Sequence, residues 1–304
     1  MNRTKASIQF LPHIGEYYQL CKPKVVYLIL FTAAAGMLLS TPGLISIDVL
    51  FFGLLGIGLG AASGAAVNHW VDRRIDEIMA RTRKRPLPQG NISSRSALVF
   101  AISLGVLSMV ILVAFINVMT AVLTFMALIG YAVIYTMFLK HSTPHNIVLG
   151  GAAGAAPPVL GWTAVTNELT VDALLLFLII FIWTPPHFWA LAIKRRDEYR
   201  KAGVPMLPVT HGVQFTKLHI VLYTLMLLSI SLLPFVTQMS SYLYLAGSVG
   251  LGLGFVYHAV KLYRCKVDEH AMKTFAYSIF YLSALFALLI TDHYLRVIIR
   301  TYFM

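Results

Sequence analysis

The stretch FFGLLGIGLGAASGAAV, residues 51–67, decides the fold, and the stretch NHWVDRRIDEIMARTRKRPLP, residues 68–88, follows it directly. The first stretch has no charged residue, and uncharged apolar runs of about 20 residues are typical of transmembrane helices. The second stretch gathers carboxylates, Lys and Arg side chains and two prolines at the end of that helix. This juxtaposition raises the question of what the charge cluster binds.

The composition extends the membrane prediction to the whole chain. The 304 residues are 58% hydrophobic and 12% charged, whereas soluble domains carry roughly 25% charged residues. We therefore expect an all-α, polytopic membrane protein with a single domain over residues 1–304. Nine apolar runs are candidate spans, at roughly 25–41, 48–68, 96–116, 118–139, 146–164, 171–193, 218–236, 241–261 and 274–293.

The basic residues form a topology signal. The formal net charge is +12, but the Lys and Arg side chains lie in the segments between apolar runs, so we expect no nucleic-acid binding. With the N-terminus in the cytoplasm, 22 of the 24 Lys and Arg residues fall on the cytoplasmic side. The positive-inside rule thus predicts a cytoplasmic N-terminus and a C-terminus on the opposite side. No transit-peptide-like extension precedes the first span, so we expect a bacterial inner membrane.

A weak internal repeat relates residues 20–140 to residues 141–262. The first and fifth spans each follow a basic residue and a proline, at Lys22 and at Lys140, and the second and sixth spans each lead into a long charged loop. This pattern predicts two four-helix units plus a ninth helix, with the site at the interface between the units. Gly- and Ala-rich runs in the second and fifth spans predict close approach of helix backbones.

Asn68, Asp72 and Asp76 are spaced at i, i+4 and i+8 where the second span reaches the membrane surface. On a helix these positions share one face, one turn apart, so they predict a stripe of oxygen atoms. Mg²⁺ prefers oxygen ligands and usually takes one or two carboxylates, waters and substrate phosphates. The stripe therefore predicts a magnesium site formed by Asn68, Asp72 and Asp76.

Arg81 and Arg85 stand shortly after the stripe. Arginine forms planar, bidentate hydrogen bonds with phosphate, so the carboxylates and arginines together favour a site for Mg²⁺ and a diphosphate. The alternative is a solvated loop that obeys the positive-inside rule. That alternative explains the basic residues but not the helical spacing of the acidic ones, since ionisable groups at membrane depth are costly and mark functional sites.

The pattern N-x-x-x-D-x-x-x-D from Asn68, followed by R-x-x-x-R-P from Arg81, resembles the first signature of the UbiA-type intramembrane prenyltransferases. The nine spans and the two matching charged loops resemble that family too, over nearly the whole chain. The resemblance implies transfer of a prenyl group from a prenyl diphosphate, with Mg²⁺ as cofactor.

The second charged loop, PPHFWALAIKRRDEYRKAGVPMLPVTHG, occupies residues 185–212. Many quinone-making members of the family have a second aspartate-rich motif here, whereas this chain has only Asp197 and Glu198 among several basic residues. The segments WTPPHFWALA and AGVPMLPV resemble the haem-farnesylating branch of the family. That resemblance implies farnesyl diphosphate as donor, haem b as acceptor, and substrate-binding roles for Lys194, Asp197, Lys201 and Trp189.

His187 and Trp189 each allow more than one role. The resemblance makes His187 a candidate catalytic residue that ligates or orients haem iron or carries a proton, and a hydrogen-bonded structural histidine is the alternative. Trp189 is expected to stack on the porphyrin or to belong to an aromatic belt at the membrane surface.

The resemblance implies a mechanism and a set of partners. Asn68, Asp72 and Asp76 are expected to hold Mg²⁺ against the diphosphate, while Arg81, Arg85, Lys194 and Lys201 neutralise its remaining charge. A vinyl group of haem b then attacks the farnesyl carbon, and haem b is a substrate rather than a cofactor. Further candidate partners are the lipid bilayer, haem A synthase, a terminal oxidase under assembly and a second copy of the chain.

Three other functions compete with haem farnesylation. A prenyltransferase of the same fold that acts on a quinone precursor is disfavoured by the missing second aspartate cluster. A transporter with an internal repeat is disfavoured because the charges gather at one membrane face rather than at mid-membrane. A non-catalytic haem-binding scaffold would require neither Asp72 and Asp76 nor Mg²⁺.

Overall fold

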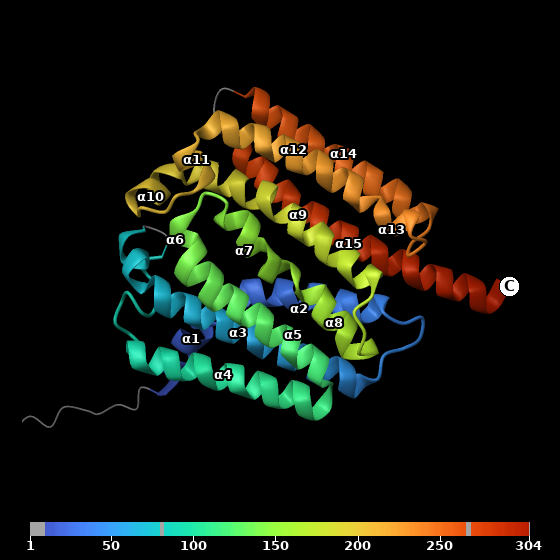
Figure 1. Ribbon diagram of the computed structural model, residues 1–304, viewed down its shortest axis with the longest axis horizontal. Helices are drawn as coiled ribbons and strands as arrows, with labels where there is room; N and C mark the ends of the chain where they lie inside the picture. Colours follow the sequence, from blue (N-terminus) through green and yellow to red (C-terminus); the bar gives the residue numbers. More distant parts are fainter. Residues whose placement is uncertain (1–9, 80–81, 266–268, 304) are drawn as a thin grey trace, which may run out of the picture.

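The computed structural model describes residues 10–79, 82–265 and 269–303 of the chain (Figure 1). The described residues form a bundle of helices that lie side by side, with short connections at both ends. The helices are α1 (Phe10–Leu20), α2 (Pro23–Leu39), α3 (Ile47–Ile78), α4 (Ser94–Phe115), α5 (Val118–Ile129), the π-helix η1 (Gly130–Leu139), α6 (Lys140–Ser142), α7 (Asn146–Ala155), α8 (Pro157–Thr166), α9 (Val171–Lys194), α10 (Arg196–Lys201), α11 (Leu207–Thr210), α12 (Val213–Ser231), α13 (Leu233–Val236), α14 (Tyr242–Arg264) and α15 (His270–Phe303).

The number of spans agrees with the sequence prediction. Eight helical segments among the described residues are long and apolar enough to cross a membrane, and α1 with α2 adds a ninth if that pair, bent by 55°, counts as one span. The prediction of an all-α, polytopic membrane protein is therefore confirmed. The fourth and fifth predicted spans are composite, because α5 continues into η1 and α7 continues into α8.

Two helices extend beyond the predicted apolar spans. The second span was expected to end near residue 68, but α3 continues to Ile78, and the last helix continues to Phe303 rather than ending near residue 293. Hydropathy detects only the part of a helix that is apolar, whereas backbone hydrogen bonding continues into polar sequence. The extension of α3 is important because it keeps Asp72 and Asp76 on the same helix as Asn68.

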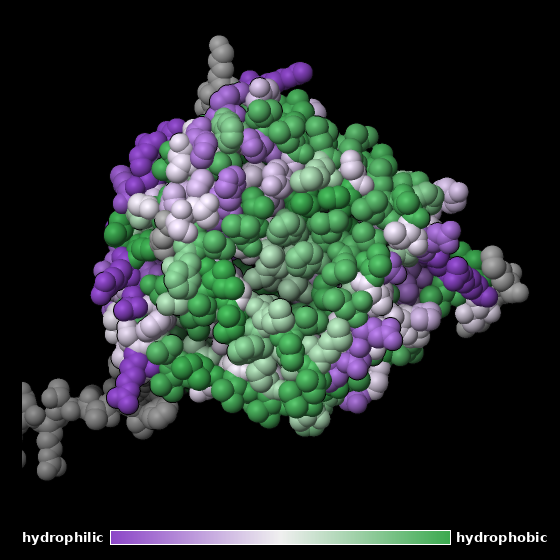
Figure 2. All heavy atoms as spheres, in the orientation of Figure 1, coloured by the Kyte–Doolittle hydropathy of each residue, from purple (hydrophilic) through white to green (hydrophobic). Residues whose placement is uncertain are grey.

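The spans differ in how much of their apolar surface other helices cover. More than half of the apolar window is buried in α3 (56%), α7 with α8 (61%) and α9 (67%), but only 17% in α4 and 17% in α5 with η1. The exposed face of the molecule is largely apolar between hydrophilic groups at its two ends (Figure 2). α3, α7 with α8, and α9 therefore form the centre of the bundle. α4 and α5 lie at its lipid-facing surface.

Glycines allow the central helices to approach at backbone distance. A Cβ atom at Gly161 in α8 would lie 1.9 Å from the carbonyl oxygen of Ala33 in α2, and a Cβ at Gly36 would lie 2.0 Å from that of Pro158. Only glycine fits such a crossing, as the small-residue runs predicted. α8 comes from the second predicted repeat unit and α2 from the first, so the two units share one packed interior, and the repeat itself stays a prediction.

Two adjacent glycines in α7 allow this helix to pack closely against η1 and against α9. A Cβ at Gly150 would lie 2.1 Å from the Tyr135 ring of η1, and a Cβ at Gly151 would lie 3.1 Å from the Thr184 side chain of α9. α7 therefore packs tightly between η1 and α9.

Candidate active site

Asn68, Asp72 and Asp76 lie on one buried face of α3, where they are 4%, 3% and 3% exposed. Asn68 Nδ2 donates a hydrogen bond of 2.9 Å to Asp72 Oδ2, which confirms that these two side chains are neighbours. We refer to the three residues as the acidic stripe. Burying carboxylates costs free energy unless cations or hydrogen-bond donors compensate them.

Cations from three separate segments compensate the acidic stripe. Lys140 Nζ, at the start of α6, lies 2.6 Å from Asp72 Oδ2. Arg85 Nη1, in the turn after α3, lies 2.7 Å from Asp76 Oδ2. Lys22 Nζ, between α1 and α2, donates a hydrogen bond to Asn68 Oδ1. The stripe is therefore the centre of a polar network inside an otherwise apolar bundle.

The backbone at Lys22 has an unusual conformation. Lys22 has φ 49° and ψ 61°, in the left-handed region, and precedes Pro23 at the first position of α2. A non-glycine residue in this region costs about 1–3 kcal/mol and persists where its surroundings impose it. The left-handed residue lies at the 55° bend between α1 and α2, which places the Lys22 amine on the stripe.

The π-helix η1 supplies neutral donors and acceptors. Asn68 Nδ2 donates to Thr136 Oγ1 at 3.2 Å, and Lys22 Nζ lies 3.4 Å from the Tyr131 hydroxyl. The Thr136 hydroxyl in turn donates to the Tyr131 carbonyl oxygen at 2.8 Å. π-Helical segments occur frequently at functional sites, and here the segment directs two polar side chains at the stripe.

The acidic stripe fits a magnesium ion. Asp72 Oδ1 is buried and has no hydrogen-bond partner among the described residues, so one carboxylate oxygen remains available. The described residues contain no group of three His, Cys, Asp or Glu side chains placed to hold a metal. Two carboxylates and an amide oxygen match Mg²⁺ nevertheless, because this ion usually takes few protein ligands and completes its shell with waters and substrate phosphates.

Among the predicted phosphate-binding residues that the structure describes, Arg85 alone forms an ion pair with the stripe. Arg81 lies outside the described residues. Lys194 and Lys201 are exposed at the ends of α9 and α10, and no hydrogen bond or ion pair joins them to the stripe within the described part of the chain. Asp197 is also exposed and pairs with Arg200 Nη1 at 3.2 Å.

Lys22 and Lys140 were missed as site residues by the sequence analysis. Both had been noted only as marks of the internal repeat. The signal that could have identified them was their matching position, each just before a span. A lysine that precedes a span at the cytoplasmic side can reach the polar face of α3 from either of the two predicted repeat units.

His187 and Trp189 lie on α9, apart from the acidic stripe. The His187 Nδ1 atom lies 2.7 Å from Ser278 Oγ of α15. Trp189 is 1% exposed and packs in an apolar cluster with residues such as Val204 and Ile220. No hydrogen bond joins either residue to the stripe among the described residues.

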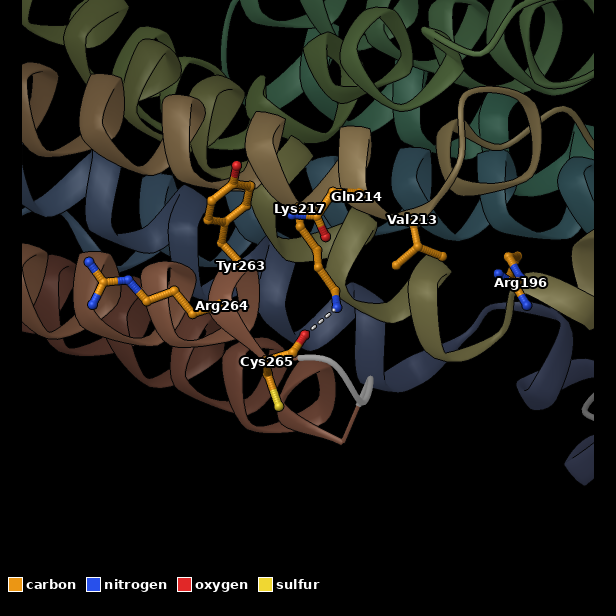
Figure 3. A pocket seen from close by; sticks show the side chains of 7 residues that line it. All are labelled: Arg196, Val213, Gln214, Lys217, Tyr263, Arg264 and Cys265. Atoms are coloured by element: carbon orange, nitrogen blue, oxygen red, sulfur yellow. Dashed lines mark hydrogen bonds between the residues drawn. The ribbon is translucent and has the colours of Figure 1, made fainter.

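A cavity of ≈ 440 Å³ lies elsewhere, where α10 and α12 begin and α14 ends (Figure 3). Its lining residues are Arg196, Val213, Gln214, Lys217, Tyr263, Arg264 and Cys265. Figure 3 shows the Lys217 amine directed at the Cys265 carbonyl oxygen, which accepts its hydrogen bond at 2.9 Å. The lining contains none of the predicted site residues.

A comparison with family models identifies the chain. The model of the UbiA prenyltransferase family matches residues 29–285. The chain belongs to the UbiA prenyltransferase family. This membership confirms the resemblance seen in the sequence and makes the protein an intramembrane prenyltransferase.

Curated relatives in the UbiA family are similar over almost their whole length. The chain is 65% identical over 287 residues to protoheme IX farnesyltransferase of Thioalkalivibrio sulfidiphilus, covering 93% of this chain and 95% of that protein. It is 62% identical to protoheme IX farnesyltransferase of Nitrosococcus oceani, over 92% of this chain and 94% of that protein. It is 59% identical to protoheme IX farnesyltransferase 1 of Pseudomonas putida, again over 92% and 94%.

Solved structures of the UbiA family share the fold at low sequence identity. A digeranylgeranylglyceryl phosphate synthase matches with a TM-score of 0.80 at 19% identity, over 93% of this chain and 99% of that one. A UbiA homologue from Archaeoglobus fulgidus bound to DMAPP and Mg²⁺ matches with a TM-score of 0.65 at 18% identity, over 90% of this chain and 99% of that one. These likenesses support the helical architecture.

Proposed function

We propose that this UbiA-family enzyme transfers a farnesyl group from farnesyl diphosphate to a vinyl group of haem b. The observation that carries the proposal is the buried acidic stripe with its three cations, in a chain 65% identical to a protoheme IX farnesyltransferase. The bond between farnesyl C1 and the diphosphate oxygen breaks, with the electron pair leaving on diphosphate. The vinyl carbon forms the new bond to C1, and water adds to the resulting cation and loses a proton, giving a hydroxyethylfarnesyl group.

The acidic stripe is the proposed site of the donor's diphosphate. Mg²⁺ held by Asn68, Asp72 and Asp76 would stabilise the negative charge that develops on the leaving diphosphate. Before substrate binds, Lys140 and Arg85 neutralise the two aspartates. We infer that these cations turn to the diphosphate when the metal takes over the carboxylates, so the chain keeps each charge paired in both states.

The other predicted residues retain proposed roles. Arg81, Lys194 and Lys201 supply further positive charge for the diphosphate. Asp197, which pairs with Arg200 in the described structure, keeps its proposed substrate-binding role in the second loop. His187 and Trp189 belong to the acceptor side, on α9. The apolar bundle receives the farnesyl chain and limits access of water to the reactive carbon.

The setting of the reaction is also a proposal. We place the enzyme in a bacterial inner membrane, with the N-terminus and the acidic stripe on the cytoplasmic side and the C-terminus opposite. In this orientation the polar diphosphate approaches from the cytoplasm, while the farnesyl chain and haem approach within the bilayer. Haem A synthase, a terminal oxidase under assembly or a second copy of the chain are the proposed protein partners.

Product analysis tests the reaction. The purified protein in detergent is incubated with haem b, farnesyl diphosphate and Mg²⁺, and mass spectrometry is expected to find haem carrying one added farnesyl group and one added hydroxyl group. Chelating the metal with EDTA is expected to stop product formation, and added Mg²⁺ to restore it. A folded protein that prenylates an aromatic quinone precursor but not haem b would overturn the proposal in favour of the quinone branch.

Lys140→Met is expected to weaken binding of farnesyl diphosphate. A hydrogen bond to a charged group contributes about 1.5–3 kcal/mol, so the KM for farnesyl diphosphate should rise about 10- to 100-fold. Steady-state kinetics with haem b in excess measures this change, and Lys273→Met, at an exposed lysine of α15, is the control that should leave KM unaltered. An unchanged KM in Lys140→Met would mean that Lys140 only neutralises Asp72.

A further inference from the structure

The His187 side chain is held on three sides. The Trp183 ring stacks on it at 4.2 Å between centroids and 18° between planes, and the Phe275 ring stacks at 4.4 Å and 23°. Two near-parallel rings at these distances fit only on opposite faces of the imidazole. The third constraint is the contact between Nδ1 and Ser278 Oγ at 2.7 Å. The Phe188 ring also meets His187, edge-on at 5.0 Å between centroids and 83° between planes. His187 therefore has a fixed ring plane.

The hydrogen-bond network assigns the tautomer of His187. The Ser278 hydroxyl donates its single proton to the Phe275 carbonyl oxygen at 2.6 Å, because a carbonyl oxygen can only accept. Ser278 Oγ must then accept from His187, so Nδ1 carries the proton. In a neutral imidazole this leaves the lone pair on Nε2.

The neighbourhood fixes Ser278 as well. Trp183 Nε1 donates to the Ser278 carbonyl oxygen at 2.8 Å, so α9 and α15 are joined by two hydrogen bonds at this one serine. The same Trp183 ring covers a face of His187. A change of the histidine ring orientation would therefore break packing and hydrogen bonding together.

Nε2 of His187 is the ring nitrogen without a hydrogen-bond partner among the described residues. The residue as a whole is 8% exposed. Metal-ligating histidines almost always donate their other ring N–H to a hydrogen-bond acceptor, which fixes the tautomer and ring orientation. Imidazole with an in-plane lone pair on Nε2 is also the common axial ligand of haem iron.

We propose that Ser278 is a positioning residue that holds His187 Nε2 as the axial ligand of the iron of the acceptor haem. This inference rests on the proposed function, in which haem b is the acceptor. A ligand on the iron holds the porphyrin at its centre. The vinyl groups lie at the porphyrin edge, so iron ligation leaves them free to react with the farnesyl carbon.

Spectroscopy of the haem complex tests the proposal separately from catalysis. Haem b is titrated into the full-length protein in detergent without farnesyl diphosphate, and resonance Raman spectra of the ferrous form are expected to show an iron–histidine stretch. His187→Gly should lose this band, and added imidazole should restore nitrogen ligation in that variant, which also shows that it is folded. A band that persists in His187→Gly would overturn the assignment of His187.

Ser278→Ala tests the positioning role. The variant is expected to bind haem b about 10-fold more weakly, since loss of an outer hydrogen-bond partner typically costs 10- to 100-fold in metal affinity. Its iron–histidine stretch should shift to lower frequency, because the donated hydrogen bond strengthens the ligand. Ser278→Thr keeps the hydroxyl and should restore both values. Thr291→Val, which removes an exposed hydroxyl of α15 bonded to its own helix, should change neither.

The outcomes separate the two proposals. An unshifted stretch and unchanged affinity in Ser278→Ala would overturn the positioning role. A wild-type protein that makes the farnesylated product but shows no iron–histidine stretch would overturn iron ligation and leave the proposed function standing. A wild-type protein that makes no such product and shows no such stretch would overturn both.

Discussion

Asp72→Asn is expected to lower the rate of farnesyl transfer by at least about 100-fold, the effect typical of removing one group that stabilises charge in a transition state. Asp72 is the central residue of the acidic stripe and is 3% exposed. Its Oδ2 accepts from Asn68 and Lys140, and its Oδ1 is the buried oxygen without a partner among the described residues. The substitution removes the negative charge that we assign to Mg²⁺ binding while keeping the shape of the side chain.

The loss in Asp72→Asn should depend on metal concentration. If the variant binds Mg²⁺ more weakly, raising the Mg²⁺ concentration should recover part of the rate, measured by mass spectrometry of the haem product. Glu77→Gln is a matched control, since Glu77 is an exposed carboxylate further along α3 and should keep wild-type activity. Size-exclusion chromatography in detergent checks folding. Normal conversion of haem b by Asp72→Asn would contradict the metal assignment.

Gly161→Ala is expected to destabilise the folded protein by about 3 kcal/mol or more, at the upper end of the range for overpacked cores. The new methyl group would lie 1.9 Å from the Ala33 carbonyl oxygen, so the backbones of α2 and α8 must separate. No side-chain rotation can relieve a clash between a Cβ atom and a backbone oxygen. The expected result is a large drop in the thermal unfolding midpoint of the protein in detergent.

Gly154→Ala is the control for this prediction. Gly154 lies on α7, is exposed, and a Cβ there would meet nothing within 4 Å. Replacing a helical glycine with alanine stabilises a helix by up to about 1 kcal/mol, so the unfolding midpoint should stay the same or rise. Equal unfolding midpoints for Gly161→Ala and the wild type would show that α2 and α8 are not in backbone contact.

The sequence predicted the features that depend on local spacing. The helical interval between Asn68, Asp72 and Asp76 predicted a shared face, and Asn68 and Asp72 are hydrogen-bonded in the structure. The apolar runs predicted the spans because hydropathy acts over neighbouring residues. Hydropathy alone ended the second span near residue 68, while the spacing of the stripe predicted that the helix continues, as α3 does to Ile78.

Contacts between distant residues were beyond the sequence. Lys22 is 46 residues from Asn68 and Lys140 is 68 residues from Asp72, and their side chains meet only through the crossing of several helices. Ser278 is 91 residues from His187 and has no motif of its own. A lone serine in an apolar helix carries no distinguishing pattern, and the matching positions of Lys22 and Lys140 do not name their partners, so these contacts follow only from the packed structure.

The origin of the stripe's partners has a consequence for synthesis of the protein. The hydrogen bonds described for the stripe come from residues 22–140, whereas His187 is completed by Ser278 of the last helix. A ribosome that has delivered α6 to the membrane has thus already supplied the acidic stripe and the cations paired with it, and the proposed Lys194 and Lys201 follow. The proposed haem-binding groups are complete only near the end of translation, so the nascent chain gains its two substrate sites in a fixed order.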